Sequence, residues 1–576
     1  MNKRIFLAVV LTVGVIALSQ LLFPPIPPAE PDATAPRALD VPGAVAGQPD
    51  AVLPPGQDPI VPTIGEVEPL VAADSVDAIP VVRAETTEVA TPVSLWGMSN
   101  VGAAPVRVRI EEHRSLSNGA LDPDAPPVEM VRDGEALISY RVAVPGDTVS
   151  FANTPFTVSR STGSDGAPVL DYRAMRDGIE LAIRYAFVPD SYLVRVTVTA
   201  AGAPARSFLM VGLPSGIRSA ESDTLEDQTH LAYAYKPQST GASSIGFGKL
   251  DPGEQRLQSG PLTWVAAKNK YFIVGLLNPE GAQPFAEFTA VGGARTGQRP
   301  TNASGTVLLP ISGEPAEFEL YAGPQEWRRL VALGRDFKDS NPYGGFMQGI
   351  VQPFATIVMA VLLWMRETTM LSYGWVLVIF GVAVRLVMWP LNQKAMRAQM
   401  RMTRIQPDIQ AVQKKYAKDP QKQQQEIMKV YKEHGMSPFS MFSGCLPLLL
   451  PMPIYLALFI VFRNTIEYRG VPFLWLDDIS LKDPYYILPL LMGATTFLVS
   501  WIGMRGMKEI PQQQKMIMYV IPITMTFVLL NFASGLNLYY TIQNIAALPQ
   551  QWLIARERVK VTAEAEAARA AKAKKE

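Results

Sequence analysis

Apolar residues are concentrated in long runs at the start of the chain and again after residue 345. Residues 5–23 form a run of nineteen mostly apolar residues after Lys3 and Arg4, long enough to cross the hydrocarbon core of a bilayer. Five later runs have the length and composition of membrane spans: residues 372–390, 441–462, 485–503, 516–531 and 536–554. The pattern predicts an α-helical polytopic membrane protein with an N-terminal anchor and a five-helix core.

The N-terminal segment, residues 1–23, has two interpretations. Small residues at Ala17 and Ser19 have the spacing of a signal-peptide cleavage site. However, the apolar run continues beyond Ser19, which favours an uncleaved anchor. Lys3 and Arg4 then stay in the cytoplasm by the positive-inside rule.

Two segments of different character follow the anchor. Residues 24–92 contain fifteen Pro and eleven Asp or Glu, and we expect an extended Pro/Ala-rich acidic linker. Residues 93–335 instead show strand patterns. Val194–Thr199 alternates apolar and polar residues, Trp264–Asn278 resembles a hairpin around Lys268-Asn269-Lys270, and Phe318–Tyr321 is a short strand before Gly323-Pro324. Residues 93–335 therefore form a predicted all-β sandwich domain.

The distribution of charge predicts the topology. Residues 391–437 carry ten Lys or Arg and four Asp or Glu, a net charge of +6, so this segment should be cytoplasmic. The β domain is then periplasmic, and both termini are cytoplasmic. Residues 343–366 cannot also cross, and we expect them to lie at the outer interface as an amphipathic helix. Within the basic segment, residues 391–436 have the apolar spacing of a helical hairpin.

Overall composition excludes several kinds of site. The chain has one Cys and three widely separated His, which argues against a disulfide framework or a zinc site. It shows no Gly-rich phosphate loop, so we expect no cofactor and no nucleotide hydrolysis. Lys plus Arg and Asp plus Glu both number 52, and this balance argues against a dedicated nucleic-acid binder.

Arg385 lies inside the span of residues 372–390, about five residues or 7–8 Å from its cytoplasmic end. One interpretation is an Arg that extends its side chain to the inner headgroups. The other is an Arg that faces a wet cavity, because a charge inside the membrane is costly and commonly functional. The other predicted core spans contain no Asp or Glu, which favours a solvated groove over a packed ion pair.

The last predicted span offers a polar face. Asn537, Tyr540, Thr541 and Asn544 are spaced i, i+3, i+4 and i+7, with Tyr539 and Gln543 beside them. Such a stripe either lines water or joins helices through hydrogen bonds. The residue pattern leaves both possibilities open.

A further set of sequence runs lies in the second half of the chain: Val384–Leu391, Gln406–Gln410, Tyr431–Pro438, Gly444–Pro447, Met452–Leu458 and Ser534–Tyr540 with Asn544. Taken together, these runs resemble the YidC/Oxa/Alb family of membrane protein insertases. Trp264–Ala266, Leu320–Pro324 and the N-terminal anchor resemble the longer Gram-negative form of this family. That form has a periplasmic β-sandwich similar to sugar mutarotase folds.

The resemblance implies a membrane protein insertase and chaperone that works without ATP, alone or with the Sec translocon, and is not an enzyme. Its five-helix core, residues 372–556, would enclose an inward-open hydrophilic groove in which Arg385 attracts acidic residues of a client. The implied groove residues are Arg385, Asn537, Tyr539, Tyr540, Gln543 and Asn544.

The resemblance also implies partners. These are nascent inner-membrane proteins, SecYEG and SecDF, membrane lipids, the ribosome and the signal recognition particle receptor, with no role for DNA. The candidate hairpin contacts are the basic residues Lys394, Arg397, Arg401, Arg404, Lys414 and Lys415. These residues either form plain solvated surface or touch lipid phosphates, RNA or a partner. The basic tail, residues 557–576, is short, which argues against a strong ribosome tether.

The sequence departs from the family pattern at two positions, and two other functions compete with membrane protein insertion. Pro451 and Gly381 occupy positions where some family members carry Gln and Thr, which argues against a polar groove wall at these two positions. A small-anion secondary transporter that uses Arg385 would need paired inverted repeats, and five spans do not divide evenly. A periplasmic carbohydrate-active enzyme would need clustered acids or His, and the β domain offers only His113 and His230 as His.

Overall fold

The computed structural model describes residues 84–118, 122, 124–296, 299–300, 302–311, 314–341, 348–417, 419–433, 452–505 and 512–573. The predicted anchor, most of the predicted linker and the first part of the predicted span 441–462, with Pro451, lie outside these residues.

A small antiparallel sheet begins the described chain. Its strands are β1 (Thr86–Ala90), β2 (Ser94–Ser99), β3 (Pro105–Arg114) and β4 (Pro127–Glu129), in that order across the sheet. β1 lies inside the segment predicted as linker, and Val89 is buried in the core. The predicted boundary at residue 93 is therefore too late, because a β-branched run, Thr-Thr-Glu-Val-Ala, follows the last Pro-rich stretch.

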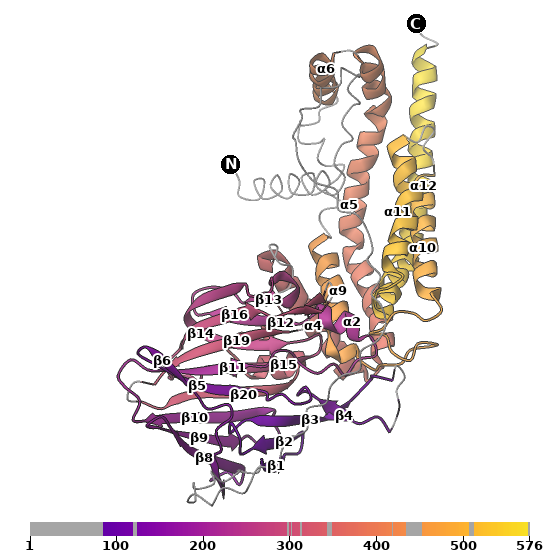
Figure 1. The fold of residues 1–576 in the computed structure, drawn as a ribbon. Helices are drawn as coiled ribbons and strands as arrows, with labels where there is room; N and C mark the ends of the chain where they lie inside the picture. The colour runs from indigo at the N-terminus through magenta and orange to yellow at the C-terminus, as the bar shows by residue number, and fades with distance from the viewer. Residues whose placement is uncertain are drawn as a thin grey trace, which may run out of the picture. The chain divides into compact units, whose positions relative to one another are not determined.

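A fourteen-stranded sheet forms the rest of the β domain (Figure 1). Its main path runs β6-β5-β11-β19-β16-β14-β15-β20-β10-β9-β8-β7, and β12 and β13 join beside β14. The strands are β5 (Ser139–Val144), β6 (Asp147–Ser150), β7 (Thr157–Thr162), β8 (Pro168–Arg176), β9 (Ile179–Phe187), β10 (Leu193–Ala201), β11 (Phe208–Leu213), β12 (Ala232–Pro237), β13 (Ser243–Gly246), β14 (Gln255–Lys268), β15 (Phe272–Leu277), β16 (Phe285–Gly292), β19 (Ala303–Pro310) and β20 (Ala316–Pro324).

The three strand predictions that rested on sequence patterns agree with this sheet. Val194–Thr199 lies in β10, Phe318–Tyr321 lies in β20, and the two strands pair with each other. β14 and β15 form the expected hairpin around residues 268–270. Alternate residues of β9 are buried, as a strand with one face on a core requires.

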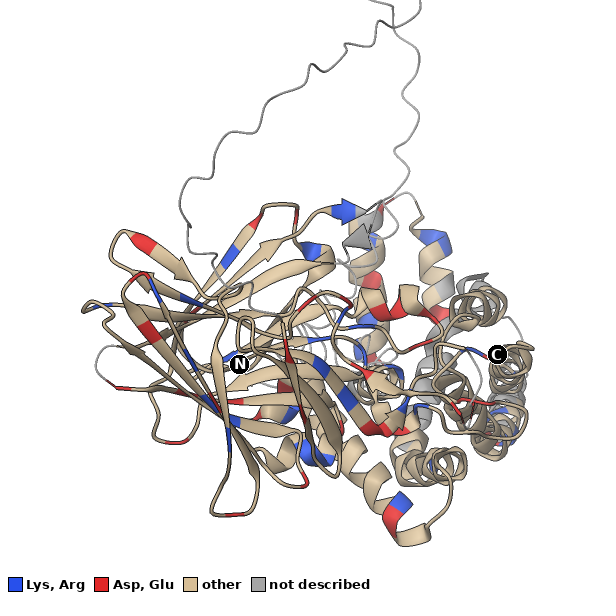
Figure 2. Ribbon diagram, turned by 60° about the horizontal axis from the view of Figure 1, so that its bottom comes forward, with Lys and Arg blue, Asp and Glu red and all other residues tan. Residues whose placement is uncertain are grey.

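Short elements complete the β domain. A two-stranded ribbon consists of β17 (Arg295–Thr296) and β18 (Arg299–Pro300). The short helices are α2 (Thr224–Thr229), η1 (Phe247–Lys249), α3 (Trp327–Ala332) and η2 (Phe337–Ser340). Figure 2 shows acidic and basic residues spread over this domain.

Long helices make up the second half of the chain. They are α4 (Gln348–Thr369), α5 (Tyr373–Lys415), α6 (Pro420–Glu433), α9 (Met452–Asn464), α10 (Ile487–Gly503), α11 (Gln512–Leu529) and α12 (Ser534–Ala573), with η4 (Ile466–Tyr468) after α9. In the described part of the chain, residues Gln348–Thr369 and Tyr373–Gln393 are each long and apolar enough to cross a membrane. Each predicted core span overlaps one of α5, α9, α10, α11 and α12.

Two helices continue past the predicted boundaries. α5 is unbroken from the predicted span 372–390 into the first arm of the predicted hairpin, although Pro390 and Pro407 lie within it. Its 43 residues correspond to about 64 Å. α12 likewise passes the predicted core end at residue 556 without interruption and ends at Ala573. The predicted bounds at residues 390 and 556 therefore do not coincide with helix ends.

A common apolar core joins α4, α5, α9, α10 and α12. Val351, Ala355 and Met359 of α4 are buried in it, whereas Ile357 and Trp364 on the opposite face are exposed. Both faces of α4 are thus apolar, unlike the polar-faced helix expected for residues 343–366. The depth of α4 in the membrane stays a prediction.

Candidate functional site

Arg385 is held between α5 and α12. Its Nη2 donates a hydrogen bond to Gln550 Oε1 at 2.9 Å, and Gln550 Nε2 donates to the Trp389 carbonyl at 3.1 Å. Gln550 is 1% exposed, whereas Arg385 is half-buried. One buried amide therefore orients the guanidinium and ties the two helices together at the same point.

The residues beside the polar stripe are packed. Tyr539 is fully buried, with its ring centre 5.3 Å from that of Phe462 on α9. Gln543 Nε2 donates to the Gly381 carbonyl at 3.0 Å and to Tyr539 Oη at 2.9 Å. Gly381 lies against Ile542, so this part of the wall is closed by protein atoms.

The Asn residues of the stripe bond to neighbouring helices. Asn537 is buried and donates to the Leu529 carbonyl of α11 at 3.1 Å. Asn544 Nδ2 donates to Thr496 Oγ1 at 2.8 Å and to Thr495 Oγ1 at 3.2 Å on α10. Among the described contacts, these Asn side chains therefore join helices, which is the second of the two interpretations of the stripe.

The structure thus divides the six predicted groove residues. Arg385, Tyr540 and Asn544 retain partial exposure, and Asn537, Tyr539 and Gln543 are buried. Gln550, which orients Arg385, was missed by the sequence reasoning. A signal for it exists, because Tyr539, Gln543 and Gln550 are spaced i, i+4 and i+11 and share one helical face.

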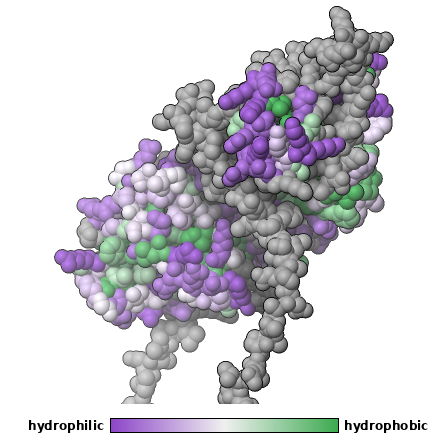
Figure 3. All heavy atoms as spheres, turned by 90° about the horizontal axis from the view of Figure 1, so that it is seen from above, coloured by the Kyte–Doolittle hydropathy of each residue, from purple (hydrophilic) through white to green (hydrophobic). Residues whose placement is uncertain are grey.

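The predicted hairpin, residues 391–436, corresponds to the second half of α5 and to α6. Lys414 and Lys415 are exposed, and Lys415 and Lys422 both lie near the Tyr416 ring, at 5.4 and 5.7 Å. The side chains of the other predicted contacts lie outside the described residues: Lys394, Arg397, Arg401 and Arg404. The surface view of Figure 3 includes a concentration of hydrophilic side chains.

The α9–α10 segment contacts the β domain through a buried ion pair. Arg469 Nε donates to Glu221 Oε1 at 2.7 Å, with the two side chains 4% and 6% exposed. Arg469 also donates to the Arg114 carbonyl at 2.9 Å. Nearby, Glu467 Oε1 accepts the Trp327 N–H at 2.9 Å, and burial raises the pKa of Glu467 to about 7.

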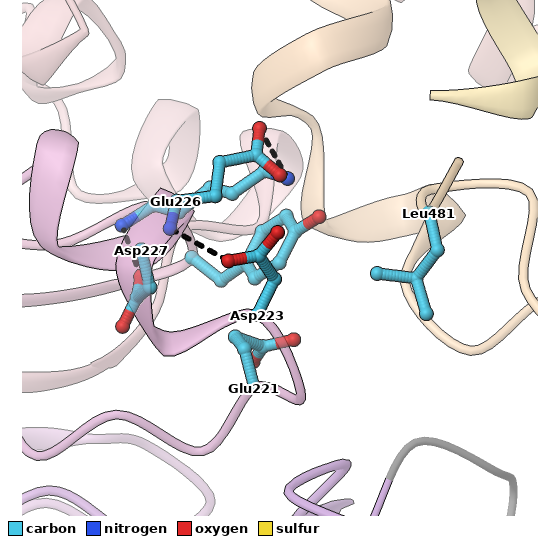
Figure 4. Close-up of a pocket in the computed structure, with 7 residues that line it drawn as sticks. Glu221, Asp223, Glu226, Asp227 and Leu481 are labelled. Carbon is cyan, nitrogen blue, oxygen red and sulfur yellow. Dashed lines mark hydrogen bonds and ion pairs between the residues drawn. The ribbon is translucent and has the colours of Figure 1, made fainter. Parts of the chain in front are cut away.

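An acid-rich pocket lies beside this contact (Figure 4). Glu221, Asp223, Glu226 and Asp227 contribute to its lining. The Asp227 carboxylate accepts hydrogen bonds from Asn269 Nδ2 and the Lys270 N–H, and Lys270 Nζ lies 3.3 Å from Glu226. In the described part of the chain, no group of His, Cys, Asp and Glu is arranged to hold a metal ion. The pocket acids thus have basic or amide partners within the protein.

Of the two His residues of the β domain, His113 lies in an ion-pair network in which Arg329 bridges Glu326 and Glu112, so both acids are already paired. His113 Nε2 lies 2.9 Å from Glu326, which also accepts from Arg329 Nε. His230 is deeply placed, and burial lowers its pKa to about 3. The carbohydrate-active enzyme therefore gains no support from these residues.

Comparison with known proteins gives two family matches and many relatives. Residues 364–562 match the 60Kd inner membrane protein family, and residues 86–357 match the YidC periplasmic domain. A membrane protein insertase YidC from Chlorobium phaeovibrioides is 30% identical over 447 residues, or 74% of each chain.

The chain belongs to the YidC family.

Another YidC relative, from Chlorobium luteolum, is 31% identical and covers 67% of this chain and 68% of its own. Among solved structures, an active YidC insertase with its first transmembrane domain resolved is 18% identical and has a TM-score of 0.32. It covers 82% of this chain and 93% of that chain. A galactose mutarotase-like protein from Lactobacillus casei is 10% identical, with a TM-score of 0.28, and covers 42% of this chain and 99% of that chain.

Membership of the YidC family confirms the coarse fold class, a helical core with a β-sandwich domain that matches the YidC periplasmic-domain family. The YidC periplasmic-domain match begins at residue 86, where β1 begins. The second match contains both Arg385 and Gln550.

Proposed function

We propose that this chain is a membrane protein insertase and chaperone of the inner membrane. The observation that carries the proposal is a half-buried Arg385 held by Gln550 between two core helices of a YidC-family protein. We further propose that the β domain is periplasmic, that both termini and the α5–α6 hairpin are cytoplasmic, and that α4 lies at the outer interface.

The mechanism follows from the cost of moving charge into lipid. An acidic residue at the centre of a membrane helix costs roughly 2.5–3.5 kcal/mol on insertion scales. A guanidinium within reach offsets part of that cost while the acidic flank of a client crosses. Exposed apolar residues beside Arg385 on α5, Leu386 and Val387, offer a surface for the client's apolar segment.

No step in this scheme uses a nucleotide, since apolar transfer of the client segment into lipid is itself favourable. The proposed partners are nascent inner-membrane proteins, membrane lipids, SecYEG, SecDF, the ribosome and the signal recognition particle receptor. Exposed Lys414 and Lys415 of the hairpin suit anionic partners on the cytoplasmic side.

Insertion in a depletion strain tests the proposal. We expect Arg385→Ala to reduce insertion of a reporter with an acidic translocated tail at least fivefold, and Arg385→Lys to retain more activity. Arg366→Ala is the matched control, because Arg366 lies over the Tyr373 ring at 5.7 Å and not at this site.

Photocrosslinking supplies the second arm of the test. A photoreactive residue at Val387 should yield adducts with the nascent reporter. Wild-type insertion by Arg385→Ala for every client would refute the role of Arg385, and absence of adducts at Val387 would favour a small-anion transporter.

A further inference from the structure

Two Trp–Arg pairs have the same local geometry, one at the C-terminal end of α10 and one within α12. Arg505 lies over the Trp501 ring, with its guanidinium carbon 4.0 Å from the ring centre, and Arg556 lies over Trp552 at 3.5 Å. In each pair the Arg follows the Trp by four residues, so its side chain can fold back over the indole. Both Trp residues are 42% exposed, and both Arg residues are exposed.

Contacts between α10 and α12 bring the two pairs to the same level. Gly503, two residues after Trp501, accepts a hydrogen bond from Arg558 Nη1 through its carbonyl. A Cβ on Gly503 would lie 3.3 Å from the Oε1 of Gln551, the residue before Trp552. The first turns of both helices are also bonded to one segment, residues 479–483. On α12 the Gly535 N–H donates to the Ile479 carbonyl, and on α10 the Leu488 N–H donates to the Asp483 carboxylate.

The side chains of the two Trp–Arg pairs suit the boundary between lipid chains and headgroups. Tryptophan rings are favoured at the membrane interface, where an apolar body meets water. A guanidinium over an indole face keeps its planar N–H edge available and is well matched to a phosphate diester. Exposed apolar residues continue on α12 beside Trp552, at Leu553 and Val559.

We propose that Trp501–Arg505 and Trp552–Arg556 together form a binding edge for an anionic phospholipid of the cytoplasmic leaflet. The leaflet assignment rests on the topology in the proposed function, whereas the lipid chemistry rests on the two pairs themselves. The guanidinium groups contact the phosphate, and the indole rings and Leu553 contact the glycerol and upper acyl chains. The edge lies on the solvent-exposed face of α10 and α12. It is separate from the Arg385–Gln550 site, which lies between α5 and α12.

Native mass spectrometry of the full chain in detergent tests this edge. Phosphatidylglycerol should bind more tightly than phosphatidylcholine, and Arg505→Gln/Arg556→Gln should weaken phosphatidylglycerol binding at least tenfold, since a surface cation contributes about 1 kcal/mol or fivefold. Arg505→Lys/Arg556→Lys should lose part of the binding, because Lys keeps the charge but not the planar fork.

The matched control is Arg173→Gln/Arg195→Gln, which removes two exposed cations from β8 and β10. It should leave lipid binding unchanged. Equal phosphatidylglycerol binding by the double Arg505/Arg556 variant and the wild type would overturn the proposal. The proposal would also be overturned if this double variant bound lipid normally but no longer bound ribosomes. That result would indicate that the two Trp–Arg pairs bind RNA. Failure of this proposal leaves insertion through Arg385 untouched, so the two proposals are tested separately.

Discussion

The Gln550–Arg385 contact gives a prediction about how the guanidinium is used. Gln550→Glu changes one atom of the side chain and places a carboxylate where an amide oxygen now lies 2.9 Å from Arg385 Nη2. The variant should fold, because the new acceptor suits Arg385. The new carboxylate should also form an ion pair with the Arg385 guanidinium and so compete with an acidic residue of a client.

The size of the effect follows from the distance. Charge centres about 4 Å apart interact by about 4 kcal/mol at an effective dielectric constant of about 20. A client acid must compete with that ion pair, and every 1.4 kcal/mol corresponds to about tenfold in an equilibrium constant. Even a third of the interaction energy of about 4 kcal/mol therefore predicts about a tenfold loss in insertion of the acidic client.

The assay is insertion of two reporters into proteoliposomes, one with an acidic translocated tail and one with a neutral tail. Gln550→Glu should impair the acidic reporter about tenfold or more and spare the neutral one. Gln551→Glu is the matched control, since Gln551 lies beside Gly503 on a different face of α12. Equal insertion of both reporters by Gln550→Glu and wild type would refute the reasoning, and equal loss of both would indicate a structural role for Gln550.

Three further predictions concern packing and pH. Tyr539→Ala should destabilise the helical core by about 3–5 kcal/mol through cavity formation, measured by thermal unfolding in detergent, with Tyr540→Ala less costly. Gly374→Leu should also destabilise it, because even a Cβ would lie 2.0 Å from the Phe473 ring; an unchanged melting temperature would contradict this. Burial raises the pKa of Glu467 to about 7, so ionisation of Glu467 destabilises the folded contact between Glu467 and the Trp327 N–H. Stability of that contact should be greatest below about pH 4.5, fall as the pH rises to about 7, and then level off. Hydrogen exchange of the Trp327 amide should report this trend after correction for intrinsic rates, and Glu467→Gln should abolish it.

The β domain was predictable where the sequence pattern is local. β10 alternates apolar and polar residues, and the β14–β15 hairpin has its turn in a polar Lys-Asn-Lys run. β1 was missed because five residues next to a Pro-rich stretch carry little signal without β2 as a partner. The order of fourteen strands was beyond prediction, since it depends on pairings between distant segments.

Arg385 could be singled out from the sequence as a candidate, but its contacts could not be predicted. The reason is that an Arg within an apolar run is costly in a membrane, so its presence indicates a candidate functional residue. The role of Asn544 depends on Thr496 of α10, and the role of Gln550 depends on which turn of α5 meets α12. Periodicity gives the face of one helix, whereas these contacts require the relative position of two.

The continuity of α5 has a mechanical consequence. Arg385 lies about 18 Å from the start of this helix at Tyr373, and the end at Lys415 lies about 63 Å from it. If α5 pivots as a rigid lever at Tyr373, a 5 Å displacement beside α6 moves Arg385 by about 1–2 Å, enough to lengthen its 2.9 Å bond to Gln550 beyond hydrogen-bond range. A partner that binds the α5–α6 hairpin and displaces it by this amount would thereby break the hydrogen bond that orients the Arg385 guanidinium.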